Sequence, residues 1–383
     1  MPYLFVVSLL LLSSFTYCEE KLIFAYSYSM AGTGYPKHKI LPWTLNTSLS
    51  ITPAGARQHY ILGRELRNRL ILNHNLLDHH HNPPQLIVHP IMVDRAVESA
   101  YAQAAGLYHV GTGENITNEK ARKGAMPPNK FDFEPWIKSL GLSALNHTYQ
   151  VVPLLLNGEA SDTFFDPENS CPLLKDFIIK RTTNWKTLFD KELTKLVLKL
   201  NIPKDSVNNI IHLSELRELI LDGIVEGHYI DNFDSDLSLY IDIGKTIEPY
   251  IDYTNFLDVG TTSKLLSTPI LTDIKMKFEE VHNKAVNKKI KRDDLKYVSL
   301  IGLNHRVLLA LLKQLSITPK ETPMPASILL LELYEIESGS GSARFEVRYT
   351  YDNQAGYFTF NDFINKIKGS ILSEPDFKKQ CGI

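Results

Sequence analysis

The side chains best suited to binding a metal ion are a group of histidines, His74 and Asp78-His79-His80-His81. Imidazole and carboxylate groups are common ligands of zinc and copper. The group precedes Pro83-Pro84, so a solvated loop is expected here. Adjacent histidines in a loop point in different directions, which favours a loop over a metal site. We expect neither a metal ion nor another cofactor.

Three carboxylates, Glu159, Asp162 and Asp166, could in principle support glycoside hydrolysis, which uses a pair of carboxyl groups. Nothing in the sequence brings two of them to a defined separation, so a polar loop is favoured. The chain also lacks the Gly-x-Ser-x-Gly motif of many serine hydrolases. These residues therefore do not indicate either hydrolytic chemistry.

The charge of the chain argues against a nucleic-acid partner. Its 383 residues include 41 basic and 43 acidic side chains, a formal net charge of −2, which leaves no overall positive surface. The basic run from Lys284 to Arg292 resembles an anion-binding segment, but we favour an exposed linker between two structural units. The hydrophobic content of 44% is typical of a globular protein.

Residues Met1 to Cys18 have the pattern of a secretory signal peptide. Leu4 to Leu12 is almost wholly apolar, and Glu19-Glu20-Lys21 ends the segment, although no Lys or Arg precedes it. No later run reaches the roughly 18 apolar residues that a membrane span needs. We therefore expect a mature protein without a membrane span, either secreted or in an endomembrane or lysosomal lumen.

Three Asn-x-Ser/Thr sequons, at Asn46, Asn115 and Asn146, fit a chain that enters the secretory pathway. A chain of this length carries about two or three such triplets by chance, so the motif is supportive only. We expect these asparagines to be the glycosylation sites.

Two strand-loop-helix units position the first candidate residues. Lys21 to Tyr26 is typical of a buried strand, and Thr52-Pro53 then provides an N-cap and a proline at the first helical position. Pro84 to Val88 indicates a second strand, which ends at His89-Pro90. A second helical face runs from Val93 to Leu107.

The middle of the chain, between about 131 and 293, has charged helical stretches and few runs typical of strands. Strand and helix patterns return afterwards, over residues 297–303, 307–315, 327–335 and 343–351. The alternation predicts an α/β fold: a three-layer core with a mixed, mostly parallel sheet flanked by helices, plus an inserted α-helical cap. We expect residues 1–18 to be removed and a single domain over 19–383, with its core at about 19–130 and 294–383 and its cap at about 131–293.

The chain resembles the histidine acid phosphatases over nearly the whole mature sequence. Ile51 to Gln58 is similar to the family's L-T-x-x-G-x-x-Q stretch, and Asp94-Arg95 to the segment after its second core strand. Cys171-Pro172, after Val152-Pro153-Leu154, resembles the C-P pair that follows a V-P-L segment in the family. Glu332-Leu333-Tyr334 also resembles a family segment. These motifs agree with those of the family in their residue types, in their order and in their separations along the chain.

The family's nucleophilic histidine belongs to R-H-G-x-R-x-P after the first strand. There it accepts the phosphoryl group while arginines neutralise the phosphate oxygens. The aligned segment here is Met30-Ala31-Gly32-Thr33-Gly34-Tyr35-Pro36. The resemblance therefore implies that Ala31 replaces the nucleophile, and that Met30 and Gly34 replace the two arginines.

Two further family positions are also altered. A phosphate-binding arginine after the second core strand falls on His89, and the family's His-Asp pair falls on Asn304-His305. In the family that histidine binds phosphate and the aspartate protonates the leaving alcohol. Nowhere in the chain is His followed by Asp or Arg followed by His. A shift of the alignment would therefore not restore the motifs.

The resemblance also implies a disulfide between Cys171 and Cys381, because the family's C-P cysteine pairs with one near the C-terminus. These two remain if the signal peptide removes Cys18. We predict a secreted, glycosylated, histidine-acid-phosphatase-like pseudoenzyme that acts as a binding or interaction scaffold, with an unknown small molecule or protein in the former phosphate cleft. The alternative is an acid phosphatase or other hydrolase with rearranged catalytic residues.

Overall fold

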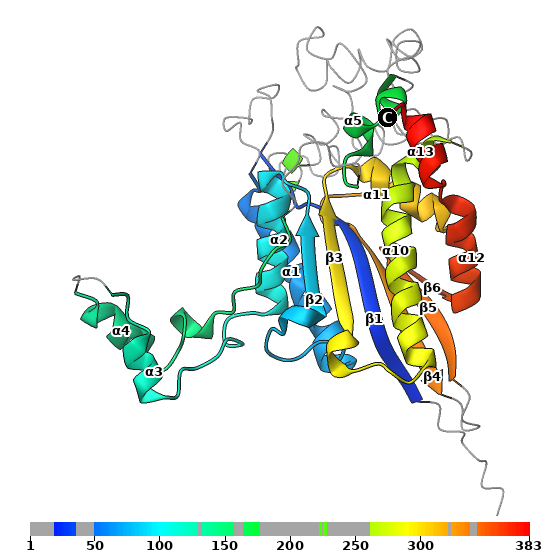
Figure 1. Cartoon of the computed structure of the whole chain (residues 1–383). Helices are drawn as coiled ribbons and strands as arrows, with labels where there is room; N and C mark the ends of the chain where they lie inside the picture. The colour runs from blue at the N-terminus through cyan, green and yellow to red at the C-terminus, as the bar shows by residue number, and fades with distance from the viewer. Residues whose placement is uncertain are drawn as a thin grey trace, which may run out of the picture.

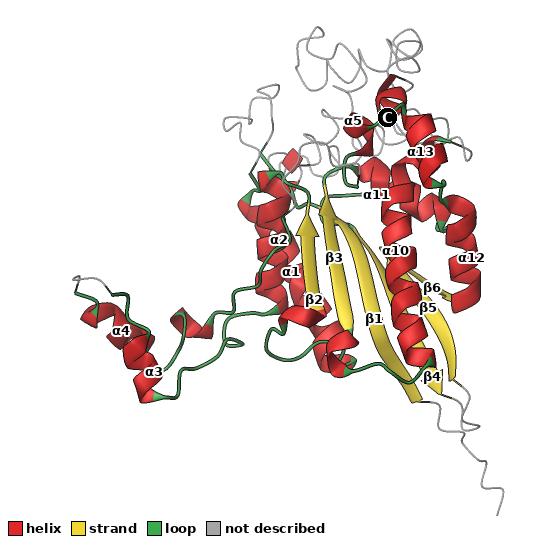
Figure 2. Cartoon of the chain, in the orientation of Figure 1, coloured by secondary structure: helices red, strands yellow, loops and turns green. Residues whose placement is uncertain are grey.

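A computed structural model describes residues 19–35, 50–128, 132–156, 164–176, 222–223, 225–227, 261–320, 323–337 and 343–383 (Figure 1). The expected signal peptide, Asn46 and most of the expected helical cap lie outside these residues. The described chain forms a sheet with helices on both of its faces, as Figure 2 shows by secondary structure.

The sheet has six strands in the order β2-β3-β1-β4-β5-β6. They are β1 (Glu19–Met30), β2 (Leu86–Pro90), β3 (Lys296–Gly302), β4 (Ile328–Glu337), β5 (Ala343–Tyr351) and β6 (Gln354–Thr359). The α/β class and the mixed sheet are confirmed. The expectation of a mostly parallel sheet is wrong, because only the pairings β2-β3 and β3-β1 are parallel while the other three are antiparallel.

The helices divide between the two faces of the sheet. The longer ones are α1 (Pro53–Arg67), α2 (Asp94–Leu107), α10 (Thr262–Val286), α11 (His305–Gln314), α12 (Phe360–Ser370) and α13 (Glu374–Cys381). The shorter helices are α3 (Glu119–Gly124), α4 (Glu134–Leu140) and α5 (Pro167–Ser170). A π-helix, η1 (Asn68–Asn73), follows α1, and single 3-10 turns occur at η2 (Pro83–Gln85), η3 (Asn146–Thr148) and η6 (Arg292–Asp294).

Strand β1 lies near the middle of the sheet and is buried from Leu22 to Met30, so its side chains show which helix covers which face. Phe24 meets Phe278 of α10 edge to face, at 4.9 Å between ring centroids. Successive side chains alternate between the faces. The other face carries Ser299 of β3, whose hydroxyl donates to Gln103 of α2 over 2.7 Å. Helices α10 and α2 therefore enclose the sheet from opposite sides.

Helix α1 begins as the sequence predicts. Thr52 is its N-cap, with the hydroxyl accepting from the backbone N–H of Gly55 over 3.1 Å, and Pro53 is its first residue. The helix lies against α2 at a close crossing where a Cβ added to Gly63 would be 2.0 Å from the backbone oxygen of Gln103. Only glycine fits where the two helices approach this closely.

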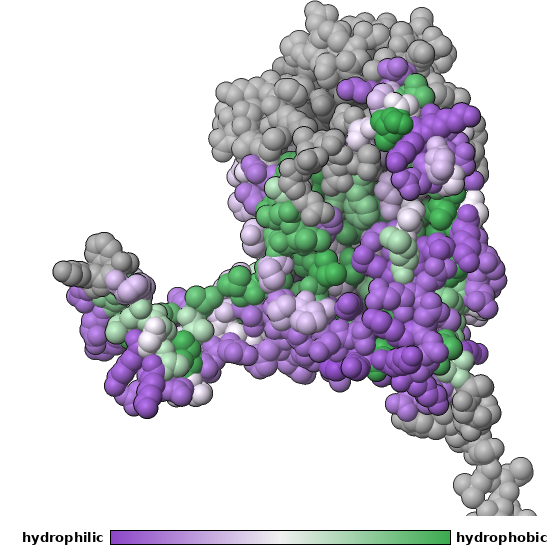
Figure 3. Space-filling model, viewed as in Figure 1, coloured by the Kyte–Doolittle hydropathy of each residue, from purple (hydrophilic) through white to green (hydrophobic). Residues whose placement is uncertain are grey.

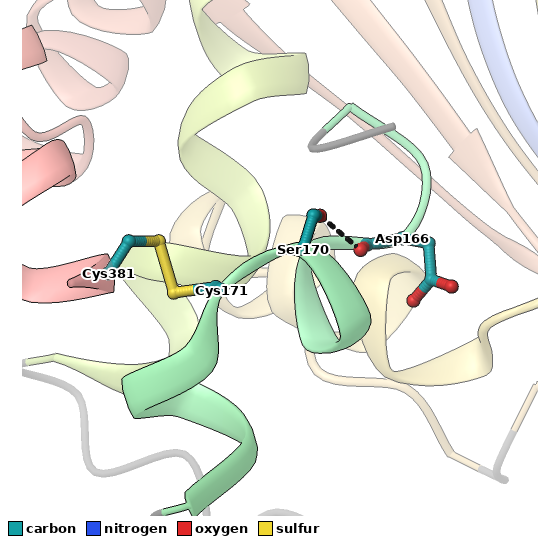
Figure 4. The surroundings of a disulfide bond; sticks show 4 residues. All are labelled: Asp166, Ser170, Cys171 and Cys381. Carbon is teal, nitrogen blue, oxygen red and sulfur yellow. Dashed lines mark hydrogen bonds between the residues drawn. A yellow bond between two sulfur atoms is a disulfide. The ribbon is translucent and has the colours of Figure 1, made fainter. Parts of the chain in front are cut away.

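The predicted disulfide between Cys171 and Cys381 is confirmed, with their Cα atoms 4.7 Å apart (Figure 4). Both cysteines are fully buried. The bond joins the segment after α5 to the end of α13, and so connects the middle of the chain to its C-terminus.

The division into core and cap stays a prediction, because most of residues 177–260 lie outside the described chain. All described sheet strands come from residues 19–90 and 296–359. One part of the expected cap needs correction. Helix α10 lies within 131–293, yet Phe278 packs on Phe24 and Asp273 accepts a hydrogen bond from Tyr26. Its apolar face therefore covers the sheet and belongs to the core.

Residues 110–128 and 132–151 extend away from the sheet and carry α3 and α4 (Figure 1). Backbone hydrogen bonds hold the two sides of this segment together, from Gly113 N to Thr148 O and from Ile116 N to Leu142 O. We call residues 110–151 the arm. Among the described residues, no helix has the length and hydrophobicity needed to cross a membrane.

Candidate functional site

The candidate residues meet where the three parallel strands end. Met30 of β1 pairs with Gly302 of β3, and Pro90 of β2 pairs with Ile301. Because the carboxyl ends of parallel strands share one edge of a sheet, ligands commonly bind there. We call this the strand-end site, and its sequence-predicted members are Met30, Ala31, Gly34, His89, Asn304 and His305.

The loop after β1 is held by hydrogen bonds from its own backbone N–H groups. Ala31 N donates to Gly302 O over 2.8 Å and Tyr35 N to Ser50 O over 3.0 Å. Gly32 N donates to the Ser99 hydroxyl, and Thr33 N to the Gln58 side-chain oxygen. These four donors face protein acceptors, whereas an anion-binding loop directs its N–H groups at the ligand. Met30 and Ala31 are buried.

Arg95 of α2 occupies the space beside Gly34 that a longer side chain would need. A Cβ built on Gly34 would lie 2.4 Å from Cδ and 2.6 Å from Nε of Arg95. Nε of Arg95 donates to Gly32 O over 2.6 Å, and Nη2 lies 3.4 Å from an Asp222 carboxylate oxygen. The guanidinium is therefore bonded to the loop and paired with a carboxylate.

His89 lies in an aromatic environment. Its ring is stacked with Phe164, at 5.9 Å between centroids and an interplanar angle of 19°, and meets Phe165 edge to face at 4.9 Å. Phe165 is completely buried. No local sequence pattern signals this contact, because the two phenylalanines lie far from His89 along the chain.

Asn304 and His305 begin helix α11. Asn304 is the N-cap, and its side-chain oxygen accepts from Arg306 N over 3.0 Å. This is a common structural role for asparagine. His305 is the first residue of the helix and is buried. The structure thus brings this pair to the same edge of the sheet as Ala31 and His89.

A buried histidine that sequence reasoning missed, His59 of α1, lies directly behind the loop. Its Nε2 lies 3.0 Å from Met30 O and can donate to it. The pKa of His59 is lowered to about 4, mainly by burial; the hydrogen bond to Met30 opposes this shift, and the positive charge of Arg95 contributes to it. The spacing of Gly55, His59 and Gly63 on the buried face of α1 was the available signal.

We expect His59 to make the protein less stable as the pH falls. The unfolded chain binds a proton at this histidine near pH 6.5, whereas the folded chain does so only at about pH 4. Stability is therefore complete above about pH 6.5 and declines by about 3 kcal/mol as the pH approaches 4. His59→Gln, measured by denaturant unfolding at several pH values, should flatten this part of the profile.

His79→Gln is the matched control, because that side chain is exposed. Its profile should follow the wild type. An unchanged slope in the His59→Gln protein would show that another group causes the acid sensitivity.

The remaining sequence candidates lie elsewhere. Nδ1 of His80 lies 2.7 Å from Thr112 O, and His81 packs edge to face on Tyr108. Among the described residues, no group of three or more His, Cys, Asp or Glu side chains is placed to hold a metal ion. Glu159 and Asp162 lie outside the described chain, and Asp166 O accepts from the Ser170 hydroxyl (Figure 4).

The basic run and the two sequons within the described residues are on the surface. Lys284 forms ion pairs with Glu280 and Asp294, and Arg292 pairs with Asp78. Asn115 and Asn146 are exposed and lie on the arm.

Comparison with known proteins establishes the fold. No protein-family model matches the sequence. The phytase of Klebsiella sp. ASR1 is similar with a TM-score of 0.62 and 11% identity, over 92% of this chain and 97% of that chain. Hafnia alvei phytase in complex with tartrate gives 0.56 and 14%, over 94% and 98%, and Citrobacter braakii phytase gives 0.54 and 14%, over 95% and 99%.

At such low identity the likeness concerns the fold alone. The chain has the histidine acid phosphatase fold, with its mixed six-stranded sheet between helical layers. The fold implied by the sequence resemblance is therefore confirmed.

Proposed function

We propose that the protein is a pseudophosphatase: a histidine-acid-phosphatase-like fold that has lost phosphoryl transfer and serves as a binding or interaction scaffold. The observation that carries this proposal is Ala31, which follows β1 directly at the position where the family resemblance places the nucleophilic histidine. A methyl group cannot form a covalent phosphoryl intermediate.

The surroundings of Ala31 support the same proposal. A side chain at position 34 would overlap Arg95 in its present position, so an arginine there would require Arg95 to move. Arg95 itself is held by Gly32 O and Asp222. The backbone donors of the loop are likewise used within the protein. Charge stabilisation of a transferring phosphoryl group is usually the largest catalytic contribution, and the absence of both motif arginines weakens it.

The other two altered positions add to the loss. His89 contacts two phenylalanine rings at the position where the family resemblance places a charged guanidinium. Such an environment favours a neutral or aromatic ligand over a phosphate ester. Asn304 uses its side-chain oxygen as a helix cap. We propose that any ligand of the strand-end site is a small molecule or protein segment of this apolar type.

The compartment remains part of the proposal. We propose that the protein is secreted or lies in an endomembrane or lysosomal lumen, and that Asn115 and Asn146 are glycosylated there. The buried Cys171–Cys381 disulfide supports an oxidising compartment.

Turnover of a generic phosphomonoester tests the proposal. We expect the purified wild-type protein to show none above background from about pH 4 to about pH 7, since loss of a nucleophile and its partners costs on the order of 10³ to 10⁶ in rate. A cooperative melt of the same sample excludes misfolding as the cause. Turnover that disappears in His89→Ala or His305→Ala would instead establish an enzyme with rearranged catalytic residues.

A further inference from the structure

One pair of adjacent basic residues differs in its surroundings from the other pairs that the structure describes. These pairs are Arg122-Lys123, Lys288-Lys289, Lys291-Arg292 and Lys378-Lys379. The first lies in α3 and the last in α13, and Arg292 begins η6, where it pairs with Asp78. Only Lys288-Lys289, in the loop after α10, combines non-helical backbone with two exposed side chains. Exposed loops are the preferred sites of proteolytic cleavage.

The loop, residues 287–291, presents its positive charge to solvent. Lys284 and Arg292 on either side of it form ion pairs with carboxylates, whereas Lys288 and Lys289 form none within the described chain. Figure 3 shows mostly hydrophilic surface at the end of the body where α10 and β3 are joined. The two ammonium groups are therefore available to the acidic specificity pocket of a trypsin-like protease.

The backbone around the bond between Lys289 and Ile290 is held by few hydrogen bonds. Neither the carbonyl oxygen of Lys289 nor the N–H of Ile290 forms one within the described chain. Lys288 N and Lys289 N donate to Ala285 O and Lys284 O in the last turn of α10, both over 2.8 Å. Lys288 also has a φ of 52°, a left-handed conformation that is strained for a residue with a side chain. A segment added as an extended strand to a protease would lose these two hydrogen bonds and relieve the strain.

The next basic pair is held more firmly. Lys291 N donates to an Asp294 carboxylate oxygen over 2.9 Å, and Asp294 N donates to Lys291 O over 3.0 Å. The guanidinium of Arg292 donates to Asp78 and to Asn75 O. These bonds fix η6 to the body of the protein, so the Lys289–Ile290 bond is the accessible one.

We propose that the Lys289–Ile290 bond is a cleavage site for a trypsin-like serine endoprotease. Hydrolysis breaks the C–N bond between these residues. Water supplies the hydroxyl group of the new carboxyl group on Lys289 and a proton to the new amino group of Ile290. Ile290 is half-buried and packs against the core, which keeps the new terminus near its present position.

The two products of this cleavage remain one molecule. Strands β1 and β2 precede the cut, whereas β3 and β4 follow it, and β3 lies between β2 and β1 in the sheet. The disulfide also crosses the cut, because Cys171 precedes it and Cys381 follows it. The expected product is therefore a two-chain protein with an intact sheet.

The cut lies away from the strand-end site. Figure 1 shows α10 and β3 joined at the end of the sheet opposite the arrowhead of β3, whereas the strand-end site follows Gly302 at that arrowhead. The inference therefore stands or fails independently of the proposed loss of catalysis.

The experiment is limited digestion of the full chain, with its disulfide intact, by trypsin. We expect the terminus at Ile290 to form at least about 10-fold faster than cleavage after Lys379 in α13, since a helix must open before it fits a protease. Mass spectrometry of the new termini measures both rates. Without reductant, residues 290–383 should stay joined to a fragment that contains Cys171, and reductant should release them.

The variant Lys288→Gln/Lys289→Gln should slow formation of the Ile290 terminus by at least about 100-fold, because the protease pocket requires a positive charge. The matched control is Lys378→Gln/Lys379→Gln, which changes an equally exposed pair within a helix. It should leave that rate unchanged. Both variants should melt at the wild-type temperature, since all four side chains are exposed.

Three results would overturn the inference. One is cleavage after Lys379 that is as fast as cleavage after Lys289. Another is release of residues 290–383 without reductant. The third is a Lys289–Ile290 bond that stays intact while Lys288 and Lys289 bind phosphatidylserine vesicles, which would make the loop a lipid-binding element.

Discussion

Arg69→Met is expected to lower the free energy of unfolding by about 3–5 kcal/mol. Arg69 forms two hydrogen bonds with the Glu332 carboxylate, at 2.6 and 2.5 Å. Glu332 is completely buried in β4. Removal of the guanidinium leaves a buried charge without its partner, and that penalty exceeds the net value of the ion pair.

Denaturant unfolding with the disulfide intact measures this effect. Arg344→Met provides the control, because Arg344 is largely exposed and pairs with Glu346 at 3.3 Å on the surface of the sheet. Its loss should cost less than about 1 kcal/mol. The double variant Arg69→Met/Glu332→Leu should recover part of the stability. Equal losses in the two single variants would show that burial of Glu332 has no special role.

Gly63→Ala is expected to destabilise the protein by about 3 kcal/mol, although alanine is the better helix former. The added Cβ would lie 2.0 Å from Gln103 O and 2.9 Å from Leu107 N, both of them backbone atoms that cannot turn away. Helices α1 and α2 would have to separate. Because these helices supply Gln58 and Arg95 to the loop after β1, that loop should loosen as well.

Gly369→Ala on α12 is the matched control, since no atom lies within 4 Å of its added Cβ. It should stabilise the protein by up to about 1 kcal/mol through helix propensity. Thermal and denaturant unfolding of the two variants would give opposite signs. A Gly63→Ala protein as stable as Gly369→Ala would mean that the α1–α2 crossing adjusts without cost.

Local signals were sufficient for much of the fold. Thr52-Pro53 marks the start of α1 because an N-cap hydroxyl and a first-turn proline act within a few residues. The alternation of Gln354–Thr359 and the N-cap at Thr359 are the local signals for β6 and α12, two elements that are absent from the predicted order. Helix α10 was assigned to the cap, because periodicity reveals an apolar face but not the layer that covers it.

At the strand-end site, too, local sequence patterns reveal the elements but not the contacts between distant segments. The family resemblance located Ala31, His89 and Asn304-His305, since each follows a predictable strand or begins a predictable helix. That Arg95 takes the space beside Gly34 depends on a contact between α2 and the loop, which no local pattern encodes. The packing of His89 on Phe164 likewise depends on chain segments that are distant in sequence.

The most direct test of the central claim is whether the strand-end site binds inorganic phosphate. An active histidine acid phosphatase must bind this product, and about 100-fold excess over the dissociation constant stabilises a folded protein by about 2.7 kcal/mol. We predict that about 10 mM phosphate at acidic pH leaves the melting temperature of the wild-type protein unchanged, apart from the shift caused by sodium chloride of equal ionic strength. A saturable stabilisation by phosphate that His89→Ala abolishes would contradict the account.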